Sequence, residues 1–270
     1  MDREIILKTS VDVAHIRRAC RVAERVIRAL APYVRPGFTT RELDRLGERF
    51  LRENGAASSL KGYRGFPASL CTSVNNVAAH GVPTDTPLEE GDVVKLDITV
   101  NIDGWHGDAA WTFIAGGRSS AGVGVDARRL LQGAWAANVA GIGAVAAGRC
   151  FGDVGAAIQE AARRHGCAVV EEYVGHGIGQ GMHEDPQVPN FGQPGTGGRI
   201  VAGMVFTIEP MVTLGSPALS VAPDGWTLAT RDGSLAAQFE HTVAVFRDRA
   251  EVLTFSGDLS AHLDFPPALP

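Results

Sequence analysis

Hydrophobic positions along the chain alternate between a helical and a strand-like spacing. Apolar side chains recur every three to four residues across 10–33 and 39–54, and the same spacing returns across 126–147 and 153–165. That spacing places apolar side chains on one face of a helix. Residues 57–115 instead have a strand-like pattern interrupted by many glycines and prolines. The pattern predicts two helical pairs, the first followed by a set of strands and turns.

The strand-like segment contains an apolar hairpin with two acids in its arms. Residues 95–113 read KLDITVNIDGWHGDAAWTF, with Asp-Gly marking the tip. Asp97 and Asp108 stand where a strand prefers Val or Ile, and a buried carboxylate is costly unless it is paired or binds a metal. If Asp103-Gly104 or the dipeptide one position earlier forms a two-residue turn, both acids lie on one face within about 5–8 Å. The hairpin therefore predicts a pair of acids that needs compensation.

A repeat along the chain adds a second pair of acids. The stretch GDVVKLD at 91–97 aligns without a gap on GMVFTIE at 203–209, and DAAWTF at 108–113 aligns on EHTVAV at 240–245. Two like halves usually pack about a pseudo-two-fold axis, so equivalent strands lie beside one another. We therefore expect four carboxylates to gather from four strands. They are Asp97, Asp108, Glu209 and Glu240.

The same repeat predicts the fold class and the domain organisation. We expect one α+β domain over residues 1–270, with duplicated halves at about 10–115 and 126–255. An antiparallel sheet would form the centre, and the helices would cover it. The proline-containing tail, residues 260–270, is expected to be irregular.

Four clustered carboxylates repel one another unless cations neutralise them. Two divalent ions would do so, and the segment YVGHGIGQGMHEDP at 173–186 offers His176 and His183 as nitrogen ligands. Glycines on both sides of His176 let the backbone approach a crowded site. An oxygen-rich set with one imidazole suits Mn(II), Fe(II) or Co(II), and zinc fits as well. Two ions that share carboxylates can hold a hydroxide nucleophile and polarise a carbonyl, which is hydrolytic chemistry.

Composition excludes several other classes of function. The 270 residues carry a net charge of −5, so there is no basic field to attract nucleic acid or anionic lipid. No apolar stretch approaches the ~20 residues of a membrane span, and the start of the chain lacks the basic-then-apolar order of a signal peptide. The four cysteines contain no C-x-x-C pair and suit a reducing compartment. We therefore expect a cytoplasmic protein that binds neither nucleic acid nor membrane.

Further motifs accompany the acids and histidines in a fixed order. They are GYRGFP at 62–67, NNVAAHGVP at 75–83, KLDIT at 95–99, HGD at 106–108, GHGIG at 175–179, MHEDP at 182–186, FTIEPM at 206–211 and QFEHT at 238–242. Together these motifs resemble the type I methionine aminopeptidases, which have the pita-bread fold. The similarity runs from about Ile6 to Thr254.

The resemblance implies an enzyme that hydrolyses the N-terminal methionine from newly made polypeptides with a small second residue. In that family two divalent ions (Co, Mn, Fe or Zn) are bound, and a hydroxide that bridges them is the nucleophile. Asp108 and Glu240 match the bridging ligands, and Glu209 matches the carboxylate that handles the proton of the attacking water. The five residues that match metal ligands are Asp97, Asp108, His176, Glu209 and Glu240.

The resemblance also implies which residues bind the peptide. His80 matches a histidine near the substrate amine and the leaving nitrogen, and His183 matches one that contacts the scissile carbonyl. Leu60 and Phe66 depart from the bacterial pattern, which often has cysteine and tyrosine there, so the selectivity of the pocket could differ. The residues that match the methionine pocket are Tyr63, Phe66, Cys71 and Trp226.

The implied partners are peptide N-termini, with the ribosome as a candidate site of association, and a monomer is expected. Two alternative functions share the fold. An Xaa-Pro dipeptidase or aminopeptidase usually carries a further N-terminal domain, and about nine residues before the first helix leave no room for one. A non-catalytic peptide-binding module is expected to lose ligands, whereas this chain retains all five candidates.

Overall fold

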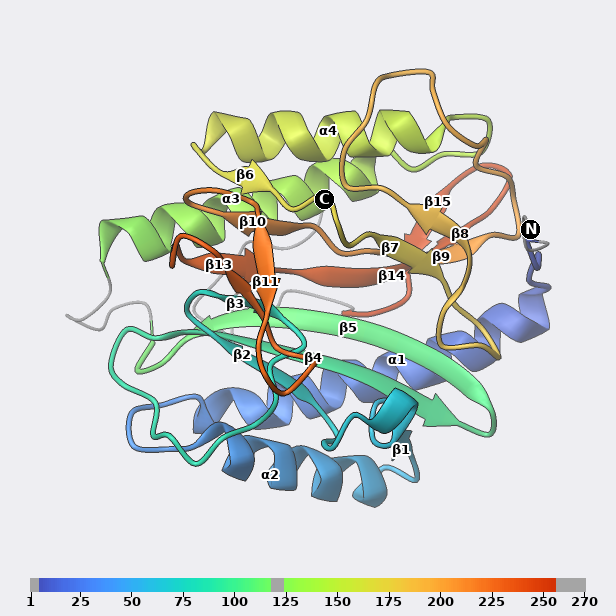
Figure 1. The fold of residues 1–270 in the computed structure, drawn as a ribbon. Helices are drawn as coiled ribbons and strands as arrows, with labels where there is room; N and C mark the ends of the chain where they lie inside the picture. Colours follow the sequence, from blue (N-terminus) through green and yellow to red (C-terminus); the bar gives the residue numbers. More distant parts are fainter. Residues whose placement is uncertain (1–4, 118–123, 256–270) are drawn as a thin grey trace.

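A computed structural model describes residues 5–117 and 124–255 (Figure 1). Within these ranges the helices lie where the hydrophobic spacing predicts them, although α3 ends four residues before the predicted 147. Glycines at the end of that segment weaken the helix. The expected irregular tail, 260–270, lies outside the described residues. The helices are α1 (Ser10–Leu30), α2 (Thr40–Glu53), α3 (Val125–Gly143) and α4 (Phe151–Arg164), with 3-10 turns η1 (Ala31–Tyr33) and η2 (Tyr63–Gly65).

The described strands form three antiparallel sheets. The largest consists of β1 (Ala57–Ser58), β2 (Cys71–Val74), β4 (Val93–Ile102), β5 (Trp105–Ile114), β7 (Gly175–Gly177), β8 (Glu184–Val188), β9 (Val205–Ile208), β14 (Glu240–Val245) and β15 (Ala250–Val252). A second contains β6 (Ala168–Val169), β10 (Met211–Thr213) and β13 (Ala236–Gln238). The third contains β3 (Val77–Ala79), β11 (Leu219–Val221) and β12 (Leu228–Thr230). The predicted α+β class is confirmed.

The β4–β5 hairpin turns at the predicted dipeptide. Asp103 and Gly104 have φ angles of 53° and 81°, the left-handed values that a two-residue hairpin turn requires. The resulting register pairs Asp97 with Ala110 and Thr99 with Asp108. The two acids are therefore diagonal neighbours on one face, as predicted.

The large sheet runs in the order β1-β4-β5-β14-β9-β7-β8. Among its strands, β4 and β5 come from the first half of the chain and lie next to β14 and β9 from the second half. The order β4-β5-β14-β9 places the equivalent strands symmetrically about the centre, as a pseudo-two-fold axis would. The internal duplication itself stays a prediction, because a sheet order does not establish descent from one ancestral unit.

The helices cover the sheet in two groups (Figure 1). In the first half of the chain, α1 packs against β4 and β5, and α2 packs against α1. In the second half, α3 contacts β9, β10 and β13, and α4 packs on α3. Across residues 5–117 and 124–255, no helix combines the length and the apolar character that a membrane crossing requires.

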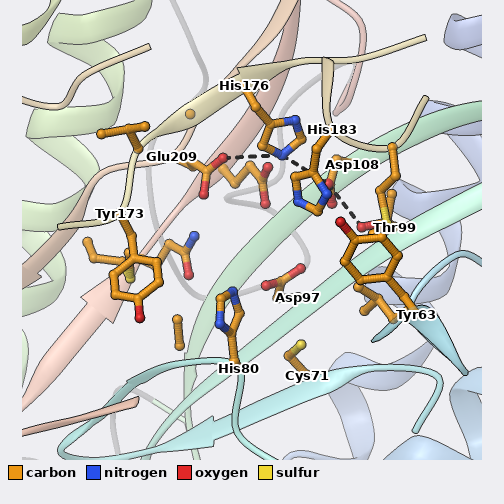
Figure 2. Close-up of a pocket in the computed structure, with 18 of the residues that line it drawn as sticks. Tyr63, Cys71, His80, Asp97, Thr99, Asp108, Tyr173, His176, His183 and Glu209 are labelled. Atoms are coloured by element: carbon orange, nitrogen blue, oxygen red, sulfur yellow. Dashed lines mark hydrogen bonds and ion pairs between the residues drawn. The ribbon is translucent and has the colours of Figure 1, made fainter. Parts of the chain in front are cut away.

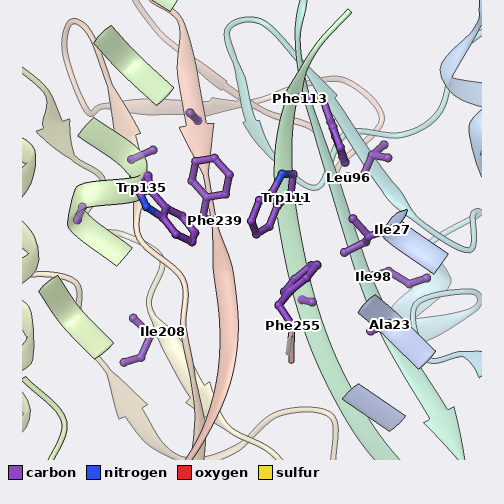
Figure 3. Close-up of a cluster of buried hydrophobic side chains, with 14 of the residues drawn as sticks. Ala23, Ile27, Leu96, Ile98, Trp111, Phe113, Trp135, Ile208, Phe239 and Phe255 are labelled. Carbon is purple, nitrogen blue, oxygen red and sulfur yellow. The ribbon is translucent and has the colours of Figure 1, made fainter. Parts of the chain in front are cut away.

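The core lies between the sheet and the helices, where side chains of β4, β5 and β14 meet those of α1 and α3 (Figure 3). Because side chains alternate along a strand, Trp111 points into this core while Asp108 points to the opposite face. Trp111 packs edge-on against Phe239 with ring centroids 5.0 Å apart. His241 also lies here, fully buried among aromatic rings, with Nδ1 2.9 Å from the Thr254 hydroxyl. His241 therefore packs in the core, on the face of β14 opposite to that of Glu240.

Gly107 gives the hairpin its close approach to α1. A Cβ atom at this position would overlap the backbone nitrogen of Cys20. Gly107→Ala is therefore expected to lower the free energy of unfolding by about 1–3 kcal/mol, the usual cost of overpacking. Denaturant titration would measure the change. Gly143→Ala is the matched control because its Cβ would meet nothing within 4 Å; equal effects of both changes would contradict the close approach.

Candidate metal centre and peptide site

All residues that the sequence assigns to metal, substrate or catalysis line one cavity of about 550 Å³. Figure 2 shows imidazoles and carboxylates from separate strands and loops facing this common space. The structure therefore brings the whole predicted set together. Its members are Tyr63, Phe66, Cys71, His80, Asp97, Asp108, His176, His183, Glu209, Trp226 and Glu240.

Three of the four acids lie around Ala110 on the face of the sheet that points into the cavity. Asp97 and Glu240 pair with Ala110 from its two sides, on β4 and β14. Asp108 precedes Ala110 by two residues and so shares its face. Glu209 directly follows β9 instead of lying within it, which corrects the expectation of four strand residues. A proline comes next in the chain and has no N–H to donate to the ladder.

His176 is held in β7 so that one ring nitrogen faces the acids. Its Nδ1 lies 3.0 Å from the Gly177 carbonyl, which accepts the ring N–H. Nε2 is then free as a lone-pair donor, 3.8 Å from Asp108 Oδ2 and 3.6 Å from Glu209 Oε1. Only glycine fits on either side, because a Cβ at Gly175 or Gly177 would overlap a neighbouring backbone carbonyl. This is the arrangement of a metal-binding histidine whose second nitrogen is fixed by a carbonyl.

The donor atoms present fit a divalent metal. Ligand atoms of Asp108, His176 and Glu240 lie within 4.8 Å of one another. Asp108 Oδ2 accepts a hydrogen bond of 2.9 Å from the Thr99 hydroxyl, but the buried Oδ1 has no partner among the described residues. A buried carboxylate oxygen without a partner is costly, and a cation would satisfy it.

The pKa values of the acids indicate the same need for positive charge. Burial raises the pKa of Asp97 to about 7 and that of Glu209 to about 8. For Asp108 and Glu240, burial and repulsion by the neighbouring acids raise the pKa well above the usual range. Conversely, burial lowers the pKa of His176 to about 3, so the imidazole is neutral and able to bind a metal. Divalent cations would favour the ionised form of all four carboxyl groups.

Two further histidines lie at other sides of the cavity. His80 follows β3 with φ of 52°, and its ring lies edge-on to Tyr173 with centroids 5.7 Å apart. His183 lies between Tyr63 and His176, with centroid distances of 5.4 and 4.3 Å. Burial lowers the pKa of both histidines, that of His183 to about 4. Both imidazoles are therefore neutral at pH 7.

An apolar subsite adjoins the acids. Phe66 and Cys71 are buried, and Trp226 lies edge-on to Phe66 with centroids 5.2 Å apart. Cys71 pairs with Asp97 across the β2–β4 ladder. Burial raises the pKa of its thiol well above the usual range, so Cys71 is a small apolar wall residue and no nucleophile. Leu60 packs on the same cluster.

Comparison with known proteins identifies the family. The model of metallopeptidase family M24 matches residues 14–246. The chain belongs to this family. A methionine aminopeptidase of Clostridium perfringens is 43% identical over 250 residues, which cover 93% of this chain and 98% of that protein. The methionine aminopeptidase of Rickettsia prowazekii is 40% identical over 264 residues, covering 97% and 99% of the two chains.

Solved structures of the metallopeptidase family agree with the fold. The crystal structure of the Rickettsia prowazekii methionine aminopeptidase superimposes with a TM-score of 0.90 at 40% identity, covering 93% of this chain and all of that one. A prolidase from Pyrococcus furiosus has a TM-score of 0.72 at 21% identity, covering 93% of this chain and 66% of the prolidase. The second likeness concerns the fold alone. The predicted resemblance to type I methionine aminopeptidases and the pita-bread fold are confirmed.

Several residues that support this metallopeptidase site are missed by sequence reasoning. The Thr207 hydroxyl donates to Glu209 Oε1 at 2.7 Å, as Thr99 does to Asp108. Both threonines could have been found, because Thr207 stands two residues before Glu209 and Thr99 pairs with Asp108 in the predicted hairpin. Arg64, at the cavity rim, carried no comparable signal.

Proposed function

We propose that this chain is a dinuclear-metal methionine aminopeptidase that removes N-terminal methionine from polypeptides with a small second residue. The observation that carries the proposal is the convergence of four acids and an imidazole beside an apolar subsite in one cavity. The names of relatives that are 40% and 43% identical over nearly the whole chain support the same activity. The proposed ligands are Asp97, Asp108, His176, Glu209 and Glu240.

The four acids among the proposed ligands fall into two groups that differ in how deeply they are buried and in their place in the sheet. Asp108 and Glu240 are the most deeply buried acids of the cluster, each raised in pKa by other acids around it, and we assign them to bridge the two ions. Asp97 lies on β4 and Glu209 directly follows β9, the two outer strands of the group of four, and each would serve one ion. When bound, two divalent ions (Co, Mn, Fe or Zn) would neutralise the acids, polarise a carbonyl and acidify a water molecule for attack.

Three residues are proposed to act on the peptide. Glu209, oriented by the Thr207 hydroxyl, accepts the proton of the attacking water and returns it to the leaving amine. His183 donates a hydrogen bond to the scissile carbonyl, and His80 contacts the substrate amine and the leaving nitrogen. Each neutral imidazole supplies one donor and one acceptor for these contacts.

The apolar subsite is proposed to hold the methionine side chain. Aromatic rings and a small thiol form a wall that suits a flexible thioether, because sulfur packs well on ring edges. Phe66 and Leu60 carry neither a hydroxyl nor a thiol, so they contribute only apolar surface to this subsite. Peptides that begin with long apolar residues other than methionine should therefore be included in the assay as competing substrates. The proposed wall consists of Tyr63, Phe66, Cys71 and Trp226.

A peptide panel tests the proposal. Purified protein, stripped with EDTA and reloaded with Mn(II), Fe(II), Co(II) or Zn(II), is expected to release methionine from Met-Ala-Ser and not from Met-Leu-Ser. Cleavage of Ala-Pro and Leu-Pro in place of Met-Ala would instead identify an Xaa-Pro hydrolase. A protein that never takes up metal, and cleaves nothing, would be a peptide-binding module.

Two partner assignments stay predictions. Sedimentation at several protein concentrations is expected to give the mass of a monomer. Cosedimentation with ribosomes that carry short nascent chains would test association at the site of synthesis. Protein that remains in the supernatant under these conditions would restrict the proposal to free peptide N-termini.

Metal affinity of the stripped protein is expected to rise with pH. Asp97 and Glu209 have pKa values of about 7 and about 8 without metal, so both carry protons at pH 6. Metal must displace these protons, and fewer remain to be displaced at pH 8.5. Calorimetry in buffers of different ionisation enthalpy should detect proton release at pH 6.5 that declines toward pH 8.5. Affinity that is constant over this range would contradict the assigned ligands.

A further inference from the structure

A buried ion pair joins the N-terminal segment to the loop that carries His183. Lys8 Nζ lies 2.5 Å from Glu184 Oε2, and only 4% and 10% of the two side chains are exposed. The partners are 176 residues apart in the chain. Removing one partner of such a pair leaves an uncompensated charge in the interior. The pair therefore constrains both segments strongly.

The loop between β7 and β8 is wrapped around this ion pair. The other oxygen of Glu184, Oε1, accepts the Gly181 N–H at 2.8 Å. A Cβ at Gly179 would lie 2.6 Å from Lys8 Cε, and one at Gly181 would lie 2.9 Å from Glu184 Cγ. The glycines thus allow the backbone to close over the two charged side chains.

Lys8 is itself fixed to the body of the protein. Its backbone N–H donates to the carbonyl of Gly203, two residues before β9, at 2.7 Å. The next residue, Thr9, caps α1 in a capping box with Asp12. On the opposite side, the His106 N–H of β5 donates to the Gly179 carbonyl at 2.8 Å. The ion pair therefore connects the loop to an anchor that cannot move independently of the sheet.

His183 depends on this loop for its position. Among the described residues its ring makes contacts with the rings of Tyr63 and His176 and forms no hydrogen bond. Ring contacts permit sliding and tilting, whereas a hydrogen bond fixes direction. Glu184 is the adjacent residue, so its attachment to Lys8 determines where the backbone holds His183.

We propose that Lys8 and Glu184 are positioning residues that hold the His183 imidazole at the scissile carbonyl. This inference rests on the proposed function. Neither residue needs to touch the peptide or the metal. A catalytic group displaced by about 1 Å can cost about 100-fold in rate even when the change lies away from the chemistry. The pair would therefore act on turnover more than on substrate binding.

Three variants test the proposal: Lys8→Met, Glu184→Gln and the double variant. Lys8→Met and Glu184→Gln preserve length and remove charge, and the Gln amide oxygen can still accept the Gly181 N–H. Each is expected to lower kcat about 10- to 100-fold with KM changed less than about 3-fold and metal content retained. The double variant should lose no more kcat than the more impaired single variant, because both single changes remove the same interaction. If Lys8→Met fails to fold, Glu184→Gln carries the test.

A readout without substrate separates positioning from general stability. In metal-free protein, the variants are expected to show faster hydrogen exchange of the Gly181 amide and shifted NMR signals of the His183 ring. Arg18→Met, which breaks the exposed Arg18–Asp103 pair (60% and 72% exposed), is the matched control and should change neither.

The outcomes that overturn the inference are distinct from failure of the proposed function. The positioning role would be overturned if both single variants kept the wild-type His183 signals and Gly181 exchange. It would also be overturned if kcat were unchanged, or if kcat fell only in proportion to a loss of bound metal. If the wild-type protein releases no methionine with any metal, the proposed function fails, and the NMR comparison still decides whether the ion pair places His183.

Discussion

Asp108→Asn is expected to lower kcat/KM by at least about 10²–10³, which is about 2.7–4 kcal/mol of transition-state stabilisation. The amide preserves the shape of the side chain and can still accept the Thr99 hydroxyl. It removes the charge of an acid that lies 3.8 Å from the proposed imidazole ligand and that has a buried oxygen without a partner among the described residues. Steady-state kinetics with a Met-Ala-Ser peptide would measure the loss.

Metal content and stability should change in opposite directions in this variant. Three remaining acids and one imidazole neutralise two dications poorly, so metal binding should weaken. Repulsion among the metal-free acids falls at the same time, because Asp108 raises the pKa of Glu240. The stripped variant is therefore expected to melt at an equal or higher temperature, while the stabilisation by added metal shrinks.

Asp103→Asn is the matched control for this experiment. It makes the same chemical change at the tip of the same hairpin, where Asn tolerates the φ of 53° and the side chain is exposed. Near-normal kcat/KM and metal content are expected. If Asp108→Asn behaves like Asp103→Asn, the two-metal assignment of the hairpin is wrong.

Glu209→Gln is expected to reduce kcat by at least about 10³, because general acid–base groups contribute about 10²–10⁴ and this carboxylate is also a proposed ligand. The amide keeps the hydrogen bond from Thr207 but cannot take a proton from water. KM should change much less than kcat, since the apolar subsite is untouched. Single-turnover kinetics at saturating metal would separate the loss of proton transfer from the loss of metal.

The pH profile gives this second prediction a further check. In the wild-type protein kcat should decline on the acid side as the metal-bound Glu209 becomes protonated, and this limb should disappear in Glu209→Gln. Glu53→Gln, an exposed change at the end of α2, is the control and should retain the wild-type profile. A wild-type acid limb in Glu209→Gln would assign the proton transfer to another group.

Local signals in the sequence were sufficient for the elements that depend on near neighbours. The Asp103-Gly104 turn was readable because few dipeptides accept two left-handed residues in succession. Once that turn is known, alternation along the strands places Asp97 and Asp108 on one face without further information. The helical spacing likewise located α1 to α4, whereas the end of α3 was missed because glycines near a helix end make its boundary ambiguous.

The candidate ligands could also be named from the sequence, since an acid inside an apolar strand stands out against its neighbours. The repeat joined Asp97 and Asp108 to Glu209 and Glu240 before any geometry was known. It could not state that Glu209 leaves its strand, which depends on how the chain turns after β9. Nor could it choose between His176 and His183 without the family resemblance, because both lie in one glycine-rich segment.

Only the tertiary structure joined Lys8 to Glu184. Neither residue is unusual in sequence: a lysine before a helix and a glutamate after a glycine-rich segment are ordinarily solvated charges. Their partnership comes from the packing of α1 beneath the hairpin and the closure of the β7–β8 loop over it. Backbone turns and strand faces are determined within a few residues, so the sequence reveals them. A buried ion pair between segments 176 residues apart is determined by how distant elements dock, and that information exists only in the folded chain.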